Sequence, residues 1–270
     1  MAIKTVKLAD GREMPALGLG TWQLTGRRCE EAVKKALELG YTHIDTAEIY
    51  GNHGEVGKGI RGFDRSKLFL VSKVWRDDLG YSSIEKACKK ALKELGTDYL
   101  DLYLIHWPND KFPIAETMKA MGRLVEDGLA RSIGISNFNI RRTGEAARAS
   151  PVPIATNQVE FHPYLYQKEL LEFCRKSKIV LTAYSPVARG GILSDAVLNE
   201  VAEKYGKTTA QVSLRWLVQH GLAVIPKSSS DAHLRENMDI FGWRLSPADM
   251  KKIDSLGAGK RLIDPGFVDL

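Results

Sequence analysis

Four side chains of the types used for proton transfer stand in or beside short apolar segments. Asp45, Lys73 and His106 each lie in a different segment, and Tyr50 follows shortly after Asp45. An ammonium group in an apolar segment is costly to bury without an anion beside it. We therefore expect Asp45 to pair with Lys73, with Tyr50 and His106 close to the pair.

These residue types suit the delivery of a proton. A phenol has a pKa of about 10 in water, and a lysine beside Tyr50 would lower that pKa and make the phenol a better acid near neutrality. Asp45 would orient Lys73, and a neutral His106 would orient a carbonyl oxygen by hydrogen bonding. Such a set protonates a developing alkoxide but supplies no electrons, so a hydride donor is implied.

The segments must lie parallel if these side chains are to meet. Short apolar runs alternate along the chain with segments of helical period, which indicates parallel strands buried on both faces. Eight strand–helix units predict a closed (β/α)8 TIM barrel, in which the carboxyl ends of the strands face a common mouth. A doubly wound open sheet is the alternative. The runs are 17–22, 41–47, 68–74, 99–107, 130–138, 155–161, 179–186 and 223–227.

Turn and cap signals complete this arrangement. The Asp10-Gly11 pair after the run 6–8 predicts a small hairpin, which we expect to cover the bottom of the barrel. Ser82 or Ser83 is expected to cap the helix that follows them. No linker divides the chain, so we expect a single domain over 1–270. Further helices are expected over 114–126, 167–177 and 231–238.

The charge balance is mildly basic, with 39 lysines and arginines against 33 acidic residues and a net charge of +6. Such a balance suits either nucleic acid or a small anionic ligand. Lysines 86, 89, 90 and 93 lie on one face of a helical segment, which is typical of a solvated face. No nucleic-acid motif accompanies them, so we expect no nucleic-acid partner.

Cysteine usage indicates a reducing compartment. Cys29, Cys88 and Cys174 are far apart and form no CxxC motif, which argues against disulfides and a zinc site. The first ten residues hold no apolar stretch, and no run approaches the roughly 18 residues that span a bilayer. We expect a cytoplasmic monomer without a signal peptide or membrane partner.

Three motifs that would point to other chemistry are incomplete. The stretch 57–62 matches GxGxxG, but it lies within a helical segment with no strand before it, which the dinucleotide fingerprint requires. The stretch 134–138 lacks the second glycine of a nucleophile elbow. The six histidines show no metal-ligand spacing, so we expect no metal.

Taken together, the motifs resemble the aldo-keto reductase superfamily, in particular its short prokaryotic type, such as 2,5-diketo-D-gluconate reductases and methylglyoxal reductases. The resemblance runs through nearly the whole chain. The matching segments are 18–22, 43–47, 50–52, 98–108, 134–138, 157–162, 184–186, 210–216 and 225–228.

The resemblance implies a catalytic tetrad of Asp45, Tyr50, Lys73 and His106, with Tyr50 as the proton donor. It also implies NADPH extended across the barrel mouth, with the nicotinamide on Tyr184 and without a Rossmann fold. The carboxamide would bond Ser136, Asn137 and Gln158, the pyrophosphate Ser185 and Val187, and the 2′-phosphate Lys227 and Ser228. The other implied cofactor contacts are Gly20, Thr21, Trp22, Asp45, Ile225, His233 and Asn237. The implied substrate pocket is Trp22, Tyr50, Trp75, His106 and Trp107.

The activity this implies is NADPH-dependent reduction of small aldehydes, α-dicarbonyls and keto-sugars such as 2,5-diketo-D-gluconate. A non-catalytic NADPH-binding partner or sensor protein is the alternative. The segment 107–113 and the tail after Leu256 are short, so we expect an open mouth whose tryptophans select weakly among small carbonyl compounds.

Three positions depart from the family pattern. His53 stands where an acidic residue is usual, and we expect little effect. The run 187–191 replaces a Leu-Gly-x-Gly sequence, so the pyrophosphate loop should differ in detail. His233 replaces an arginine that packs over adenine, and histidine does not keep the permanent charge of arginine. We therefore expect NADPH to be preferred and NADH to be used at lower preference.

Overall fold

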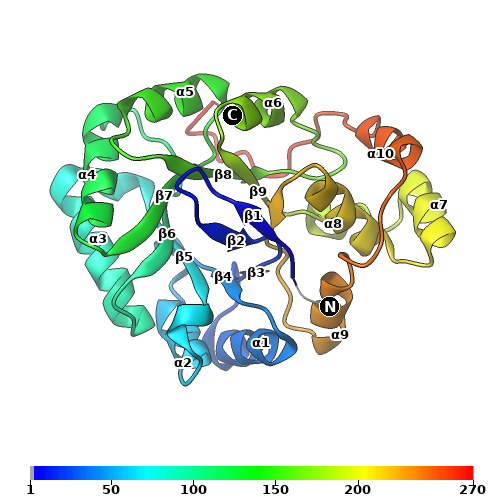
Figure 1. The fold of residues 1–270 in the computed structure, drawn as a ribbon, viewed down its shortest axis with the longest axis horizontal. Helices are drawn as coiled ribbons and strands as arrows, with labels where there is room; N and C mark the ends of the chain where they lie inside the picture. The colour runs from blue at the N-terminus through cyan, green and yellow to red at the C-terminus, as the bar shows by residue number, and fades with distance from the viewer. Residues whose placement is uncertain (1–2, 270) are drawn as a thin grey trace.

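The computed structural model describes residues 3–269 and contains two β-sheets (Figure 1). Strands β1 and β2 form an antiparallel hairpin, and the other eight are parallel in the order β10-β9-β8-β7-β6-β5-β4-β3. Because this order follows the chain without a switch point, it excludes the doubly wound alternative. The strands are β1 (Thr5–Lys7), β2 (Glu13–Pro15), β3 (Leu19–Gly20), β4 (His43–Asp45), β5 (Phe69–Val74), β6 (Leu100–Ile105), β7 (Ala130–Ser136), β8 (Ile154–Glu160), β9 (Val180–Tyr184) and β10 (Ala223–Val224).

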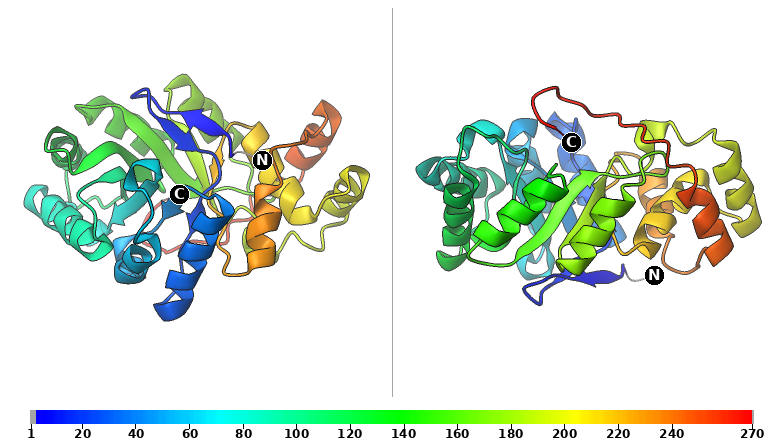
Figure 2. Two further views of the ribbon diagram at one scale, coloured as in Figure 1. Left: turned by 60° about the horizontal axis from the view of Figure 1, so that its bottom comes forward. Right: turned by 90° about the horizontal axis from the view of Figure 1, so that it is seen from above.

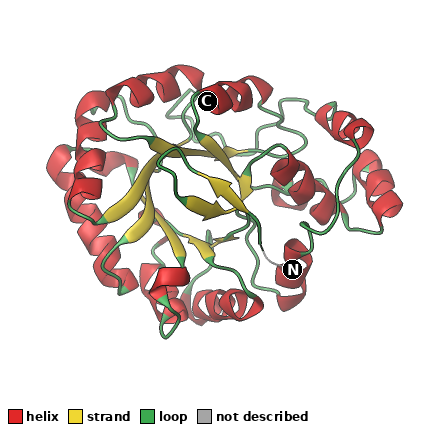
Figure 3. Ribbon diagram, in the orientation of Figure 1, coloured by secondary structure: helices red, strands yellow, loops and turns green. Residues whose placement is uncertain are grey.

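Helices alternate with the parallel strands and surround the sheet (Figure 3). The α-helices are α1 (Gly26–Leu39), α2 (His53–Ile60), α3 (Tyr81–Leu95), α4 (Ile114–Glu126), α5 (Ile140–Ala149), α6 (Lys168–Lys176), α7 (Ala196–Tyr205), α8 (Thr209–Gln219), α9 (Asp231–Met238) and α10 (Pro247–Asp254). Short 3-10 helices are η1 (Glu48–Tyr50), η2 (Arg65–Lys67), η3 (Arg76–Asp78) and η4 (Ala188–Gly190). Within residues 3–269, no helix has the length and apolar composition needed to cross a membrane.

Helix α3 shows how the sequence pattern sets these faces. Ile84, Cys88 and Leu95 are buried against the sheet, and the four lysines between residues 86 and 93 are exposed as expected. The cap prediction was wrong, because the extended residue Gly80 is the N-cap and makes no side-chain bond. The two serines predicted to cap this helix therefore lie inside its first turn.

The parallel strands curl into a half-barrel whose hydrogen-bonded ladder does not close. Strands β3 and β10 stand at the two ends of the strand order. The segment just before β3 meets β10 through one isolated parallel bridge between Leu17 and Val224. Backbone bonds from Val224 N to Ala16 O at 2.9 Å, from Gly18 N to Val224 O at 2.9 Å and from Gly20 N to Pro226 O at 3.2 Å accompany it. The predicted closed ladder is therefore incomplete at this seam. Both strands are two residues long, and Pro226 has no N–H to extend the pairing.

The β1–β2 hairpin covers the amino ends of the parallel strands, opposite the C-terminal tail (Figure 2). Leu8 and Met14 are buried against Phe69 and Leu102 inside the curled sheet. Gly11 forms the turn with a φ of 89°, which glycine adopts without strain. The predicted hairpin and its position at the bottom are confirmed.

The seam has little room, which gives a test of its contribution to stability. A Cβ on Gly20 would stand 2.6 Å from the carbonyl oxygen of Ile225. We expect Gly20→Ala to lower the free energy of unfolding by about 1–3 kcal/mol, because backbone must shift to admit the methyl group. Gly54→Ala is the control, since nothing lies within 4 Å of its added Cβ and alanine favours the helix. Equal urea midpoints for the two variants would contradict this view of the seam.

Candidate active site

A buried ion pair lies at the carboxyl ends of the neighbouring strands β4 and β5. Lys73 Nζ is 2.6 Å from Asp45 Oδ1, and the two side chains are 0% and 2% exposed. Lys73 also donates to the carbonyl oxygen of Thr46 at 2.9 Å and to the hydroxyl of Tyr50 at 3.3 Å. The second oxygen of Asp45 accepts a 2.8 Å bond from Gln158 Nε2. The predicted pairing of Asp45 with Lys73 beside Tyr50 is confirmed by this geometry.

Burial and charge act in opposite directions on the titration of this cluster. Burial alone would lower the pKa of Lys73, but Asp45 and Tyr50 raise it, and the net pKa lies above its ordinary value. Burial raises the pKa of Tyr50, and the nearby Lys73 offsets only part of that rise. The expected net lowering for Tyr50 was therefore wrong. The hydroxyl stays protonated near neutral pH, which is the state a proton donor needs.

His106 completes the cluster as a neutral imidazole. Burial, and then the charge of Lys73, lower the pKa of His106 well below its ordinary value. Its ring meets those of Tyr50 and Trp75 edge-on, with centroids 5.6 Å and 5.4 Å away. Its buried Nδ1 has no hydrogen-bond partner within the described part of the chain. A neutral ring in this position can offer an N–H to a carbonyl oxygen.

Tryptophans stand beside the cluster, as the predicted substrate pocket requires. Trp22 is 45% exposed, and its ring centroid lies 4.8 Å from that of Tyr50. Trp75 is partly buried, and Trp107 is 7% exposed at the start of the loop after β6. The rings provide apolar surface next to the groups that could transfer a proton.

The C-terminal tail also reaches this region, contrary to the sequence-based expectation of an open mouth. It crosses the end of the sheet opposite the hairpin (Figure 2). The ring of Phe267 packs edge-on against Trp107 at 5.5 Å, and the guanidinium of Arg76 lies 3.9 Å above the Phe267 ring. The tail is short but extended, so its last residues form part of the wall.

Polar residues at the ends of β7, β8 and β9 form one connected group. Ser136 Oγ donates to the carbonyl oxygen of Gln158 at 2.7 Å, and Asn137 Nδ2 donates to Ser136 Oγ at 3.0 Å. The Tyr184 hydroxyl donates to Asn137 Oδ1 at 2.7 Å. The structure therefore brings together the four residues that the sequence assigned to a nicotinamide and its carboxamide.

The loops after β9 and β10 contain the residues predicted to hold phosphate groups. Ser185 has a left-handed φ of 49°, and Val187 precedes the short helix η4. Lys227 is exposed and has no acidic group within 4 Å in residues 3–269. Ser228 is buried, and Ser230 caps α9. A free cation at the start of a helix is a chemically suitable environment for a phosphate.

The remaining predicted cofactor residues lie along the same edge. Gly20 and Ile225 meet at the seam, and the hydroxyl of Thr21 donates to the carbonyl oxygen of Asp45 at 2.9 Å. His233 is exposed in the first turn of α9, and Asn237 is buried further along it.

Sequence reasoning missed Arg28 beside the predicted phosphate loop. Arg28 is exposed near the start of α1, which packs beside α9 (Figure 1), and its Nε donates to Ser229 Oγ at 2.9 Å. This contact joins residues 201 apart in the chain. No local motif marks Arg28, so nothing in the sequence could have singled it out.

His53 links neighbouring elements of the fold, and the GxGxxG match lies mostly within a helix. The buried His53 ring lies 2.8 Å from Ser72 Oγ and 3.1 Å from Glu94 Oε2, joining α2 to β5 and α3. The stretch 57–62 lies in α2 and the turn after it, with no strand leading into it.

Within residues 3–269, no group of three or more histidine, cysteine or acidic side chains could hold a metal.

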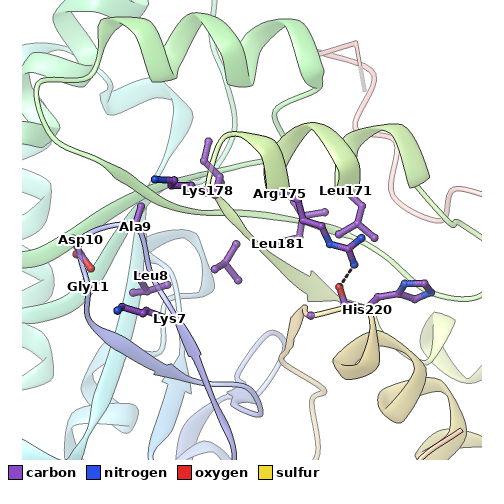
Figure 4. Close-up of a pocket in the computed structure, with 13 residues that line it drawn as sticks. Lys7, Leu8, Ala9, Asp10, Gly11, Leu171, Arg175, Lys178, Leu181 and His220 are labelled. Carbon is purple, nitrogen blue, oxygen red and sulfur yellow. Dashed lines mark hydrogen bonds between the residues drawn. The ribbon is translucent and has the colours of Figure 1, made fainter.

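A hollow of about 640 Å³ lies at the other end of the sheet, between the hairpin, α6 and β9 (Figure 4). Lys7, Arg175 and Lys178 line it together with Leu171 and Leu181. It is open to solvent and lies on the hairpin side, away from Tyr50 and Lys73. The proton-transfer cluster predicted from the sequence therefore does not lie in this hollow.

The parallel strand–helix architecture and the acid–base cluster at its carboxyl end are features of a class of carbonyl-reducing oxidoreductases. The model of the Aldo/keto reductase family matches residues 16–258. The chain therefore belongs to the aldo/keto reductase family, which confirms the resemblance seen in the sequence.

Named relatives extend over nearly the whole chain. A glyoxal reductase of Bacillus subtilis is 47% identical over 262 residues, covering 96% of this chain and 94% of that protein. A crystal structure provisionally assigned as a 2,5-diketo-D-gluconic acid reductase B has a TM-score of 0.95 and 40% identity, covering 99% of this chain and 97% of that one. An aldo/keto reductase of Brucella melitensis has a TM-score of 0.91 and 45% identity, covering 94% and 100%.

The ion pair can be tested by removing its charges singly and together. Lys73→Met leaves the Asp45 carboxylate buried without its cation, and Asp45→Asn leaves the ammonium without its anion. We expect each change to lower the free energy of unfolding by about 3–5 kcal/mol, and the double variant to lose less than the sum because no unpaired charge remains. Urea unfolding of the four proteins measures this coupling. Strictly additive losses would contradict it.

Proposed function

We propose that this protein is an NADPH-dependent reductase that converts aldehydes and ketones to alcohols at the mouth of a (β/α)8 barrel. The single observation that carries this proposal is the Tyr50 hydroxyl, 3.3 Å from Lys73 Nζ and beside the neutral ring of His106. A non-catalytic NADPH-binding protein is the second candidate. It would have no need of a buried acid–base cluster, so the intact cluster favours an enzyme.

The chain's part in the reaction is to orient the carbonyl group and to supply one proton. NADPH, when bound, supplies the hydride for the carbonyl carbon. The His106 imidazole donates a hydrogen bond that aims the carbonyl oxygen at Tyr50. The Tyr50 O–H bond breaks as its proton passes to the alkoxide oxygen, and the phenolate that remains is stabilised by Lys73. Asp45 holds Lys73 in place and balances its charge.

The donor groups fit the parts of this cofactor. Tyr184 offers a ring for the nicotinamide, with the amide and hydroxyl groups of Ser136, Asn137 and Gln158 beside it. The loop of Ser185 and Val187 is suited to the pyrophosphate. Lys227 and Ser228 are suited to the 2′-phosphate, and Arg28 brings a second cation because Ser229 occupies only its Nε.

Small carbonyl compounds are the substrate class that we propose. The wall of Trp22, Trp75, Trp107 and Phe267 offers apolar surface with few fixed polar contacts, which gives weak selectivity. The names of the glyoxal and diketogluconate reductases suggest α-dicarbonyls and keto-sugars beside simple aldehydes.

Tyr50→Phe tests the function directly. The variant keeps the ring but loses the proton donor, so we expect kcat for methylglyoxal to fall by roughly 10²–10⁴. The Kd for NADPH, measured by fluorescence quenching, should stay close to that of the wild type. Turnover of the variant at the wild-type rate would contradict the assigned donor. A wild type that binds NADPH but oxidises none with any aldehyde would favour the non-catalytic candidate.

Cofactor preference can be tested at His233. Lys227 and Ser228 favour NADPH, while a histidine at position 233 adds less positive charge than an arginine would. We expect wild type to bind NADPH more tightly than NADH, and His233→Arg to tighten NADPH binding more than NADH binding. Arg235→Met is the matched control, because Arg235 is paired with Asp231 at 2.9 Å. Equal Kd values for the two cofactors in the wild type would show that the loop holds no 2′-phosphate.

A further inference from the structure

Two ionisable side chains at the end of β8 are fully buried and have no part in the proposed reaction. Glu160 and His162 are both 0% exposed, and His162 Nε2 lies 2.8 Å from Glu160 Oε1. A buried carboxylate is found almost only where other groups satisfy it. The partners of Glu160 therefore show what it does in the fold.

Those partners are backbone groups of the C-terminal tail. Leu262 N–H donates to Glu160 Oε1 at 2.8 Å, and Ile263 N–H donates to Glu160 Oε2 at 3.0 Å. Each oxygen thus receives one of two consecutive N–H groups, from a segment about 100 residues further along the chain. Hydrogen bonds to an ionised acceptor are stronger than neutral ones, so the carboxylate is a firm attachment point for the tail.

The attached segment leads directly to the wall beside Trp107. Four residues beyond Ile263, Phe267 packs on Trp107 and under Arg76. Four residues span at most about 14 Å, so fixing Ile263 restricts where Phe267 can lie. Phe267 itself is 39% exposed, and such a half-open contact is weak support for a tail that has no regular structure.

We propose that Glu160 is a positioning residue that sets substrate selectivity by holding the C-terminal tail over the mouth. Glu160 touches neither substrate nor cofactor and acts through the tail, with Phe267 as the residue that meets the carbonyl compound. This inference rests on the proposed function for its substrate readout. Its structural readout, the attachment of the tail, does not depend on any activity.

Glu160→Gln is the most informative substitution, because glutamine keeps the shape of the side chain and replaces one acceptor oxygen by an amide nitrogen. Its amide nitrogen cannot accept from a backbone N–H, so one of the two tail bonds must be lost. Lys260 and Arg261 lie just before the attached residues and provide trypsin sites. We expect cleavage there to become about tenfold faster in native protein, since a lost bond to a charged group raises the population of the open tail by that order.

Glu169→Gln is the matched control. Glu169 is exposed on α6, so its variant should be cleaved at the wild-type rate. An unchanged cleavage rate for Glu160→Gln would overturn the attachment, whatever the activity of the protein.

The substrate arm compares a small and an aromatic carbonyl compound. We expect KM for 4-nitrobenzaldehyde to rise about threefold to tenfold in Glu160→Gln, and KM for methylglyoxal to change less than twofold, because only the larger ring reaches the Phe267 wall. In a Phe267→Ala background the same substitution should have no further effect on either KM. Independent effects of the two substitutions would overturn the coupling through Phe267.

A truncation after Arg261 provides a second test of the proposal in case Glu160→Gln does not fold. It keeps Glu160 and removes the tail, so it should reproduce the selectivity of Glu160→Gln. A truncated protein with the wild-type KM ratio would overturn the proposal. No turnover of either compound by the wild type would instead refute the proposed function and leave the cleavage result to decide the attachment.

Discussion

A buried ammonium group dictates how the rest of this site is built. Lys73 has no solvent exposure, so its charge must be matched inside the protein. Asp45 matches it from the neighbouring strand, and the second oxygen of Asp45 is bound by Gln158 on β8. Strand β8 is not beside β4 in the sheet, so this bond spans the interior and exists only because the sheet curls. Charge balance and curvature therefore depend on each other, and together they place Tyr50 where its hydroxyl meets the lysine.

The sequence was sufficient to predict those features for which a local pattern of residues allows only one arrangement. Lys73 within an apolar run needs an anion, and Asp45 was the candidate on the preceding strand. Continuous apolar runs separated by amphipathic segments led to eight parallel strands and their helices. The turn at Gly11 likewise predicted the hairpin. In each case the governing interaction lies within one element or between neighbouring elements, so residue type and spacing were enough.

The sequence was insufficient where two effects compete or where distant segments meet. The pKa of Tyr50 depends on whether burial or Lys73 dominates, and burial depth is a property of the packed site. The contacts of Glu160 with the tail and of Arg28 with Ser229 join segments far apart in the chain. The wall formed by Phe267 was missed because tail length was taken as the measure of reach. Because an extended chain advances by up to about 3.3–3.6 Å per residue, even a short tail fixed at Glu160 can reach Trp107.

The seam at Leu17 and Val224 has a consequence for how the molecule assembles. It joins the two ends of the strand order, whereas the ladders from β4 to β9 form between successive strands. Contacts between distant segments carry a larger loop-closure entropy cost and therefore form late. The sheet should acquire its full curvature in the last stage of folding. The same edge should be the first to separate when the native state opens locally. A molecule bound across Gly20 on one side and Lys227 on the other would hold the two ends together and slow that opening.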